Sequence, residues 1–84
     1  MKKYAIVVLE RGFVYVGHLD TDPITKLNLL SDAKNIRKWG TDKGLGQLVV
    51  NGPTKNTMLD PCGTVLIPDR SIISIHPTDE KLWK

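Results

Sequence analysis

The hydrophobic residues of this chain fall into short runs and alternating patterns that are typical of β-strands. Residues 4–9 form a run rich in β-branched side chains, and residues 13–19 alternate, so that Tyr15 and Leu19 share one face with Gly17. A short Glu-Arg-Gly connection joins the two segments and predicts a hairpin. A glycine in the middle of a strand often marks a bulge or a sharp bend, which small barrels need to close.

The rest of the chain continues the pattern of short strands, with two segments of a different kind. Ser31 is suited to cap a short helix that stops at Gly40, although the preceding strand can instead continue through a bend; we favour one or two helical turns. The tail predicts a single helical turn, whose Trp83 packs by default against its own chain. Further strands are expected at residues 26–30, 45–50, 64–67 and 71–75.

These elements predict a fold that is mainly β, a small antiparallel barrel or sandwich with at most one or two short helical turns. We expect a single domain over residues 1–84. A chain of this length buries only about two thirds of its unfolded surface. Association with further copies is a common source of added stability for such small domains, so we expect a homo-oligomer.

Composition narrows the class of protein. Hydrophobic residues make up 40% of the chain, which suits an ordinary folded domain. The longest apolar run, Ala5 to Leu9, is far shorter than the roughly 20 residues that cross a bilayer. The chain has no complete signal-peptide pattern, so we expect a cytoplasmic protein without a membrane partner. The single cysteine, Cys62, excludes an internal disulfide framework.

Catalytic and metal-binding signatures do not emerge from the sequence. The glycine-rich segment from Gly40 to Gly46 lacks the Gly-Lys-Ser/Thr of a P-loop and the third glycine of a dinucleotide fingerprint. His18 and His76 are far apart and have no partner at metal-ligand spacing. No serine lies in a recognisable nucleophile sequence. We therefore expect no enzyme activity, no metal and no cofactor.

The chemistry that remains is the binding of an anion. The formal charge is +3, and between Lys34 and Lys55 there are five cationic residues but only one acidic residue, Asp42. Cationic side chains neutralise phosphates, an aromatic ring offers a stacking face for a base, and amides near glycines can form an anion nest. The alternative is that the tryptophan is buried and the charges are merely solvated. The candidate ligand-binding residues are Arg37, Lys38, Trp39, Lys43, Gly44 and Lys55, with Tyr15 as a second stacking ring.

The order of these segments resembles a family of short uncharacterised bacteriophage and prophage proteins, grouped as a domain of unknown function. The most specific part of the resemblance is the segment from Leu30 to Trp39. It implies a phage context, with the host cytoplasm as the location, and no catalytic residues. A looser likeness, over residues 14–19 and 27–33, is to Sm-like and SH3-like small barrels. The Asp-Asn and Arg-Gly nucleotide-contacting signatures of Sm proteins are not evident in this chain.

Three functions follow from these patterns, in order of preference. The first is a non-enzymatic phage accessory protein that oligomerises and binds a small anionic ligand, a nucleotide, for example to sequester a host immune signalling nucleotide. The second is a nucleic-acid-binding small barrel that uses the same basic residues along a longer strand. The third is a protein-interaction or structural module of a phage.

Overall fold

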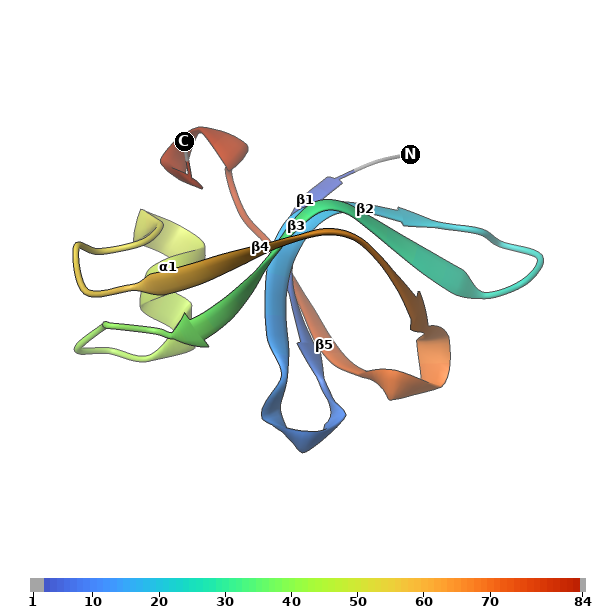
Figure 1. The fold of residues 1–84 in the computed structure, drawn as a ribbon, viewed down its shortest axis with the longest axis horizontal. Coiled ribbons are helices and arrows are strands. Elements are labelled where there is room, and N and C mark those ends of the chain that lie inside the picture. Colours follow the sequence, from blue (N-terminus) through green and yellow to red (C-terminus); the bar gives the residue numbers. More distant parts are fainter. Residues whose placement is uncertain (1–2, 84) are drawn as a thin grey trace.

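The computed structural model describes residues 3–83 and contains one five-stranded antiparallel sheet with the strand order β4-β3-β2-β1-β5 (Figure 1). This architecture confirms the expected mainly β class. A single α-helix, α1, joins β3 to β4, and three short 3-10 turns complete the described part of the chain. The bounds are β1 Lys3–Leu9, η1 Glu10–Gly12, β2 Val14–Thr21, β3 Leu27–Lys38, α1 Leu45–Asn51, β4 Met58–Pro68, η2 Asp69–Ser71, β5 Ile72–Pro77 and η3 Glu80–Trp83.

The sheet bends sharply where β2 crosses β3. The register shifts between Val16 and His18, on either side of Gly17. A β-carbon at Gly17 would lie 2.8 Å from the carbonyl oxygen of Ser31, so only glycine permits this close approach of the two backbones. The bend expected from the sequence at this glycine is confirmed.

Both faces of the bent sheet carry a hydrophobic cluster. On one face α1 and η3 cover the strands, and on the other the strands fold over themselves, as the curvature of the ribbon shows (Figure 1). The first cluster contains Ile6, Val14, Val16, Ile36, Leu48 and Trp83, and the second contains Val7, Leu19, Leu30, Ala33 and Ile67.

The helical turns favoured for residues 31–39 are wrong, because β3 runs unbroken to Lys38. Register shifts on both sides of Ala33 and a left-handed Asp32, with φ of 49°, add residues to the strand. Buried positions at Leu30, Ala33 and Ile36 are consequently three apart, which imitates a helical period. The alternative of a strand that continues through a bend is correct.

The strand expected at residues 45–50 is also wrong, since Leu45–Asn51 is helical. Leu45, Leu48 and Val49 follow the i, i+3, i+4 spacing of one helix face and pack on the first cluster. Gly52 ends the helix with φ of 78° and donates its amide to the carbonyl of Leu48. Among residues 3–83, no helix is long and apolar enough to cross a membrane.

The helical turn expected at the C-terminal end is confirmed as η3. Trp83 lies in the first cluster with only 5% of its surface exposed, so it packs within its own chain. Its indole Nε1–H donates to Thr78 Oγ1 at 3.3 Å. Together, η3 and α1 lie at one end of the sheet, opposite the turn between β2 and β3 (Figure 1).

Candidate functional site

Tertiary contacts join two loops at the α1 end of the sheet. The hydroxyl of Thr57 donates to the carbonyl of Trp39 at 2.6 Å, and the hydroxyl of Thr54 donates to the carbonyl of Gly40 at 2.7 Å. A β-carbon at Gly40 would collide with the backbone of Asn56, so this contact is too close for any side chain at position 40. The loop after β3 and the turn before β4 therefore form one continuous surface.

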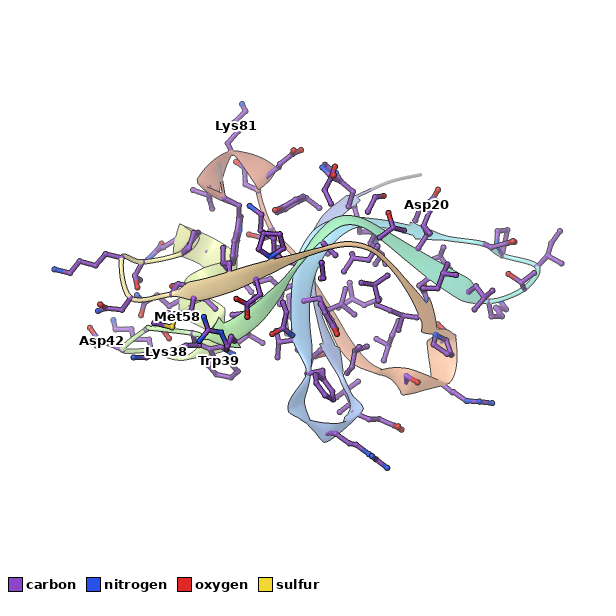
Figure 2. All side chains as sticks on the ribbon, in the orientation of Figure 1. Asp20, Lys38, Trp39, Asp42, Met58 and Lys81 are labelled. Atoms are coloured by element: carbon purple, nitrogen blue, oxygen red, sulfur yellow. The ribbon has the colours of Figure 1, made fainter. Side chains whose placement is uncertain are left out.

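This surface gathers most of the predicted cationic residues. We call Lys38, Trp39, Lys43 and Lys55 the basic loop surface; all four are exposed, Trp39 at 39%. Figure 2 shows Lys38 and Trp39 side by side at this end of the sheet, with Met58 nearby and Asp42 in the adjoining loop. The alternative from the sequence analysis, in which the tryptophan is buried, is thus wrong for Trp39.

Arg37 has a different environment from the lysines. Its guanidinium is paired with the carboxylate of Asp60 on β4, with Nε to Oδ2 at 2.8 Å and Nη2 to Oδ1 at 3.4 Å. Both side chains are about half exposed to solvent. The charge of Arg37 is therefore largely balanced within the chain, and this residue offers less to an anion than the neighbouring lysines do.

Gly44 lies directly before α1 and against the tryptophan. A β-carbon there would sit 3.9 Å from Cζ3 of Trp39, so Gly44 lies close to one edge of the ring. The amides of Asp42 and Lys43 both donate to the side-chain oxygen of Gln47, at 3.1 Å and 3.0 Å. The side chain of Gln47 thus accepts both amide hydrogens of this loop and fixes the loop to α1.

Tyr15 lies apart from the basic loop surface. It is half-buried in β2, where it pairs with Val7 on one side and Asn35 on the other, and it packs against the second hydrophobic cluster. The two hydroxyl bonds join the segments that carry the three exposed lysines and Trp39. Tyr15, in contrast, lies within the sheet.

The sequence analysis did not identify Lys26 and Arg70 as cations of one site. Lys26 and Arg70 line a cavity of about 350 Å³ between the β2–β3 turn and the β4–β5 turn, together with Asp69. They are brought together because Leu27 pairs with Pro68 across β3 and β4. Each turn carries a single cation in the sequence, so only the strand register reveals the pair. Asp69 in the same cavity offsets part of their charge.

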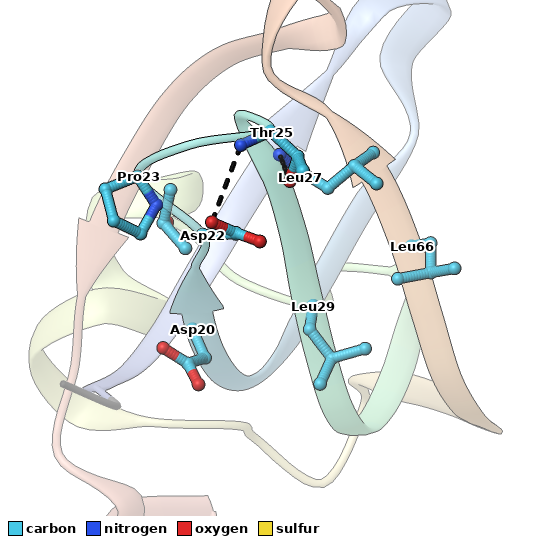
Figure 3. Close-up of a pocket in the computed structure, with 8 residues that line it drawn as sticks. Asp20, Asp22, Pro23, Thr25, Leu27, Leu29 and Leu66 are labelled. Atoms are coloured by element: carbon cyan, nitrogen blue, oxygen red, sulfur yellow. Dashed lines mark hydrogen bonds between the residues drawn. The ribbon is translucent and has the colours of Figure 1, made fainter.

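A larger groove, of about 600 Å³, lies on the outer side of the β2–β3 turn (Figure 3). Figure 3 shows Leu29 and Leu66 on adjacent strands, with Asp20 on β2 beside Leu29 and Asp22 close to the β2–β3 turn. Hydrogen bonds from the backbone amide of Ile24, and then from Thr25, hold the pKa of Asp22 below its ordinary value. The combination of leucines and carboxylates does not suit a phosphate-bearing ligand.

A polar pocket is lined by residues of the sheet and of η3, namely Tyr4, His18, Asp32, Lys34, Glu80 and Trp83. His18 Nε2 lies 3.2 Å from Glu80 Oε2, and the ring of Tyr4 meets that of His18 edge-on with centroids 5.0 Å apart. Burial, then the charges of Glu80 and Asp32, raise the pKa of the Tyr4 phenol. Among residues 3–83, His, Cys, Asp and Glu side chains form no group of three or more that could hold a metal ion.

Comparison with known proteins defines the fold. No protein-family model matches the chain, and a search of curated proteins found no match. The structure resembles a crystal structure described as that of a heptameric archaeal Sm protein, with a TM-score of 0.58 and 19% identity, over 92% of this chain and 87% of the other. The chain thus has an Sm-like fold, as the looser likeness in the sequence implied. The resemblance to a phage family gains no support from these comparisons.

Proposed function

We propose that this protein is a non-enzymatic, oligomeric small β-barrel that binds single-stranded nucleic acid through the basic loop surface. The observation that carries the proposal is the exposed indole of Trp39 among Lys38, Lys43 and Lys55, on two loops that hydroxyl groups hold together. Exposed tryptophan beside unpaired cations is what a stacked base and its flanking phosphates require.

Charge distinguishes this surface from the Lys26–Arg70 cavity and from the leucine groove. The basic loop surface has three lysines and only Asp42 beside them, whereas the Lys26–Arg70 cavity includes Asp69 and the leucine groove carries two carboxylates. Phosphate binding depends on the number of cations that a strand can contact, so the surface with the largest net positive charge is favoured.

We propose that copies of the chain assemble through the two edge strands of the sheet. β4 and β5 each have a neighbour on one side only, and they expose Leu66 and Ile73, at 64% and 65%. Open hydrophobic edges invite pairing with another strand, and a chain this small gains stability from such pairing. The Sm protein of similar fold is described as heptameric, in the context of the eukaryotic snRNP core. That ribonucleoprotein context also favours nucleic acid over a protein partner.

A free nucleotide is the second candidate ligand. The same lysines and the same ring serve one nucleotide as well as several, so sequestration of a small signalling nucleotide by a phage-type protein uses the same surface. The longer strand is preferred because the three lysines lie on separate segments, at the end of β3, before α1 and before β4. A single phosphate group cannot neutralise all of them equally well.

Binding of labelled oligonucleotides of about 12 nucleotides, followed by fluorescence anisotropy at several salt concentrations, tests the proposal. We expect the affinity to fall steeply with salt, and the variant Lys38→Ala/Lys43→Ala/Lys55→Ala to lose most of it. Trp39→Ala should weaken binding by about 1–3 kcal/mol. A matched control, Lys26→Ala/Arg70→Ala, removes cations from the opposite end of the sheet and should bind almost normally.

Each contrary outcome has a defined meaning. Loss of binding in the control but not in the lysine variant would move the interface to the Lys26–Arg70 cavity. Full competition by mononucleotides at concentrations near that of the oligonucleotide would replace the strand with a small nucleotide as the ligand. Absence of any salt-dependent binding by the unaltered protein would overturn the proposed function.

A further inference from the structure

The C-terminal latch, residues 78–83, is connected to the basic loop surface by an unbroken series of contacts. Thr78 lies at its start and is bonded to three different elements. Its amide donates to the carbonyl of Tyr4 on β1 at 3.0 Å, and its hydroxyl donates to the carbonyl of Val49 on α1 at 2.7 Å. The same hydroxyl oxygen accepts the indole N–H of Trp83 at 3.3 Å. Thr78 therefore joins β1, α1 and η3, and its hydroxyl links α1 to η3.

Packing reinforces this junction. Trp83 and Leu48 of α1 are buried in the same cluster, with 5% and 0% of their surfaces exposed. At the end of α1, Gly52 approaches Leu82 so closely that a β-carbon would lie 2.7 Å from the Leu82 carbonyl oxygen. The latch consequently holds α1 both in its middle and at its C-terminal end.

The other end of α1 holds the loop that carries Lys43. Gln47, within the helix, accepts the amide hydrogens of Asp42 and Lys43 through its side-chain oxygen. Thr41 donates its hydroxyl to the carbonyl of Gly44 at 3.0 Å, which closes the same loop. A change in the position of α1 thus moves Lys43. Lys38 is anchored differently, since it pairs with Met58 across β3 and β4.

We propose that Thr78 is a positioning residue for the ligand site: through α1, its hydroxyl sets the place of Lys43 relative to Lys38 and Trp39. The identity of the ligand in this inference rests on the proposed function. The link from Thr78 through α1 to the loop of Lys43, which we call the mechanical step, does not. Loss of the hydroxyl leaves the Val49 carbonyl and the Trp83 indole N–H without this partner. The hold of the latch on α1 is then weakened to its packing contacts, while the strands remain paired.

Hydrogen exchange of the variant Thr78→Val tests the mechanical step without any ligand. We expect the amides of residues 48–52 to exchange about tenfold faster, which corresponds to the loss of one or two hydrogen bonds from a local opening equilibrium. Amides of β1 and β2 should exchange as in the unaltered protein, and Thr78→Ser should restore the rate. Ser74→Ala is the matched control, because it removes a hydroxyl whose hydrogen-bond partner is His76 on β5 and not a residue of α1.

Double-mutant cycles on oligonucleotide affinity test the positioning itself. Thr78→Val should be coupled to Lys43→Ala, so that the second change has little further effect, and should be additive with Lys38→Ala. A uniformly destabilised protein would show no such selectivity. Unchanged exchange in α1, equally faster exchange throughout the sheet, or equal coupling to both lysines would each overturn the inference. If the unaltered protein binds no oligonucleotide, the proposed function fails while the exchange result still decides the role of the latch.

Discussion

Arg37 and Asp60 form a two-bonded ion pair across β3 and β4, at 2.8 Å and 3.4 Å. The pair lies beside the basic loop surface and withholds one cation from it. We predict that Asp60→Asn raises affinity for a single-stranded oligonucleotide about two- to fivefold, because an exposed pair of this kind is worth at most about 1 kcal/mol. The dependence on salt should steepen by about one additional phosphate contact.

Asp69→Asn is the control for that change, since it removes the same charge from the opposite end of the sheet. It should alter oligonucleotide affinity less than Asp60→Asn does. Equal gains in both variants would mean that overall charge, and not the release of Arg37, is responsible. Unfolding by urea should show little difference between Asp60→Asn and the unaltered protein.

Substitution by alanine is predicted to change the free energy of unfolding in opposite directions at two glycines near the site. Gly40 has a φ of 65°, and a β-carbon there would collide with the backbone of Asn56, so Gly40→Ala should cost about 2 kcal/mol or more of unfolding free energy. Gly46 lies inside α1 and has nothing within 4 Å of its added β-carbon. Gly46→Ala should therefore stabilise by about 0.5–1 kcal/mol. Similar urea midpoints for the two variants would contradict the close contact at Gly40.

Assembly is predicted to depend on the β5 edge. Ile73→Lys places a charge on an exposed edge strand and should give monomers in size-exclusion chromatography with light scattering, without loss of the fold. Val50→Lys is the control, because Val50 is similarly exposed, at 71%, but lies on α1. A monomeric unaltered protein would refute the proposed assembly, and an oligomer in both lysine variants would exclude β5 as its interface.

Alkaline unfolding is predicted to report on Tyr4. Because its pKa is raised above the ordinary value of 10.0, the folded state retains the phenolic proton to higher pH than the unfolded state does. The contribution of Tyr4 to the free energy of unfolding is therefore complete below pH 10.0. It is lost as the pH rises through the higher pKa of the folded state. Urea unfolding across this range should show a steeper loss of stability for the unaltered protein than for Tyr4→Phe. Parallel curves would mean that Tyr4 does not titrate differently on folding.

Local patterns were sufficient for much of the fold. The hairpin of β1 and β2, the second half of β4, β5, the bend at Gly17 and the final helical turn all follow from alternation, turn residues and a glycine in mid-strand. These features depend on interactions between residues close together in the sequence, or on which side of a strand is apolar. Single-sequence reasoning can therefore predict them.

The same reasoning failed where tertiary contacts override the local pattern. Bulges in β3 gave its buried residues a helical spacing, and the β-branched pair Val49 and Val50 concealed a short helix. Both segments take their conformation from their neighbours: β3 is held between two strands, and α1 is held against the sheet by Trp83. Propensity over a few residues is too weak to oppose such packing.

For the candidate site, the sequence by itself determined which residue types were present, a tryptophan with lysines near glycines, and the positive charge of that region. Only the tertiary structure decided that the turn carrying Lys55 is bonded to the loop after Trp39 and that Asp60 balances Arg37. It also decided that Tyr15 packs within the sheet and that Lys26 and Arg70 line one cavity. The physical reason is that charge and ring type are properties of single residues. Proximity between residues far apart in the chain is set by strand register and by loop-to-loop hydrogen bonds, which no local pattern encodes.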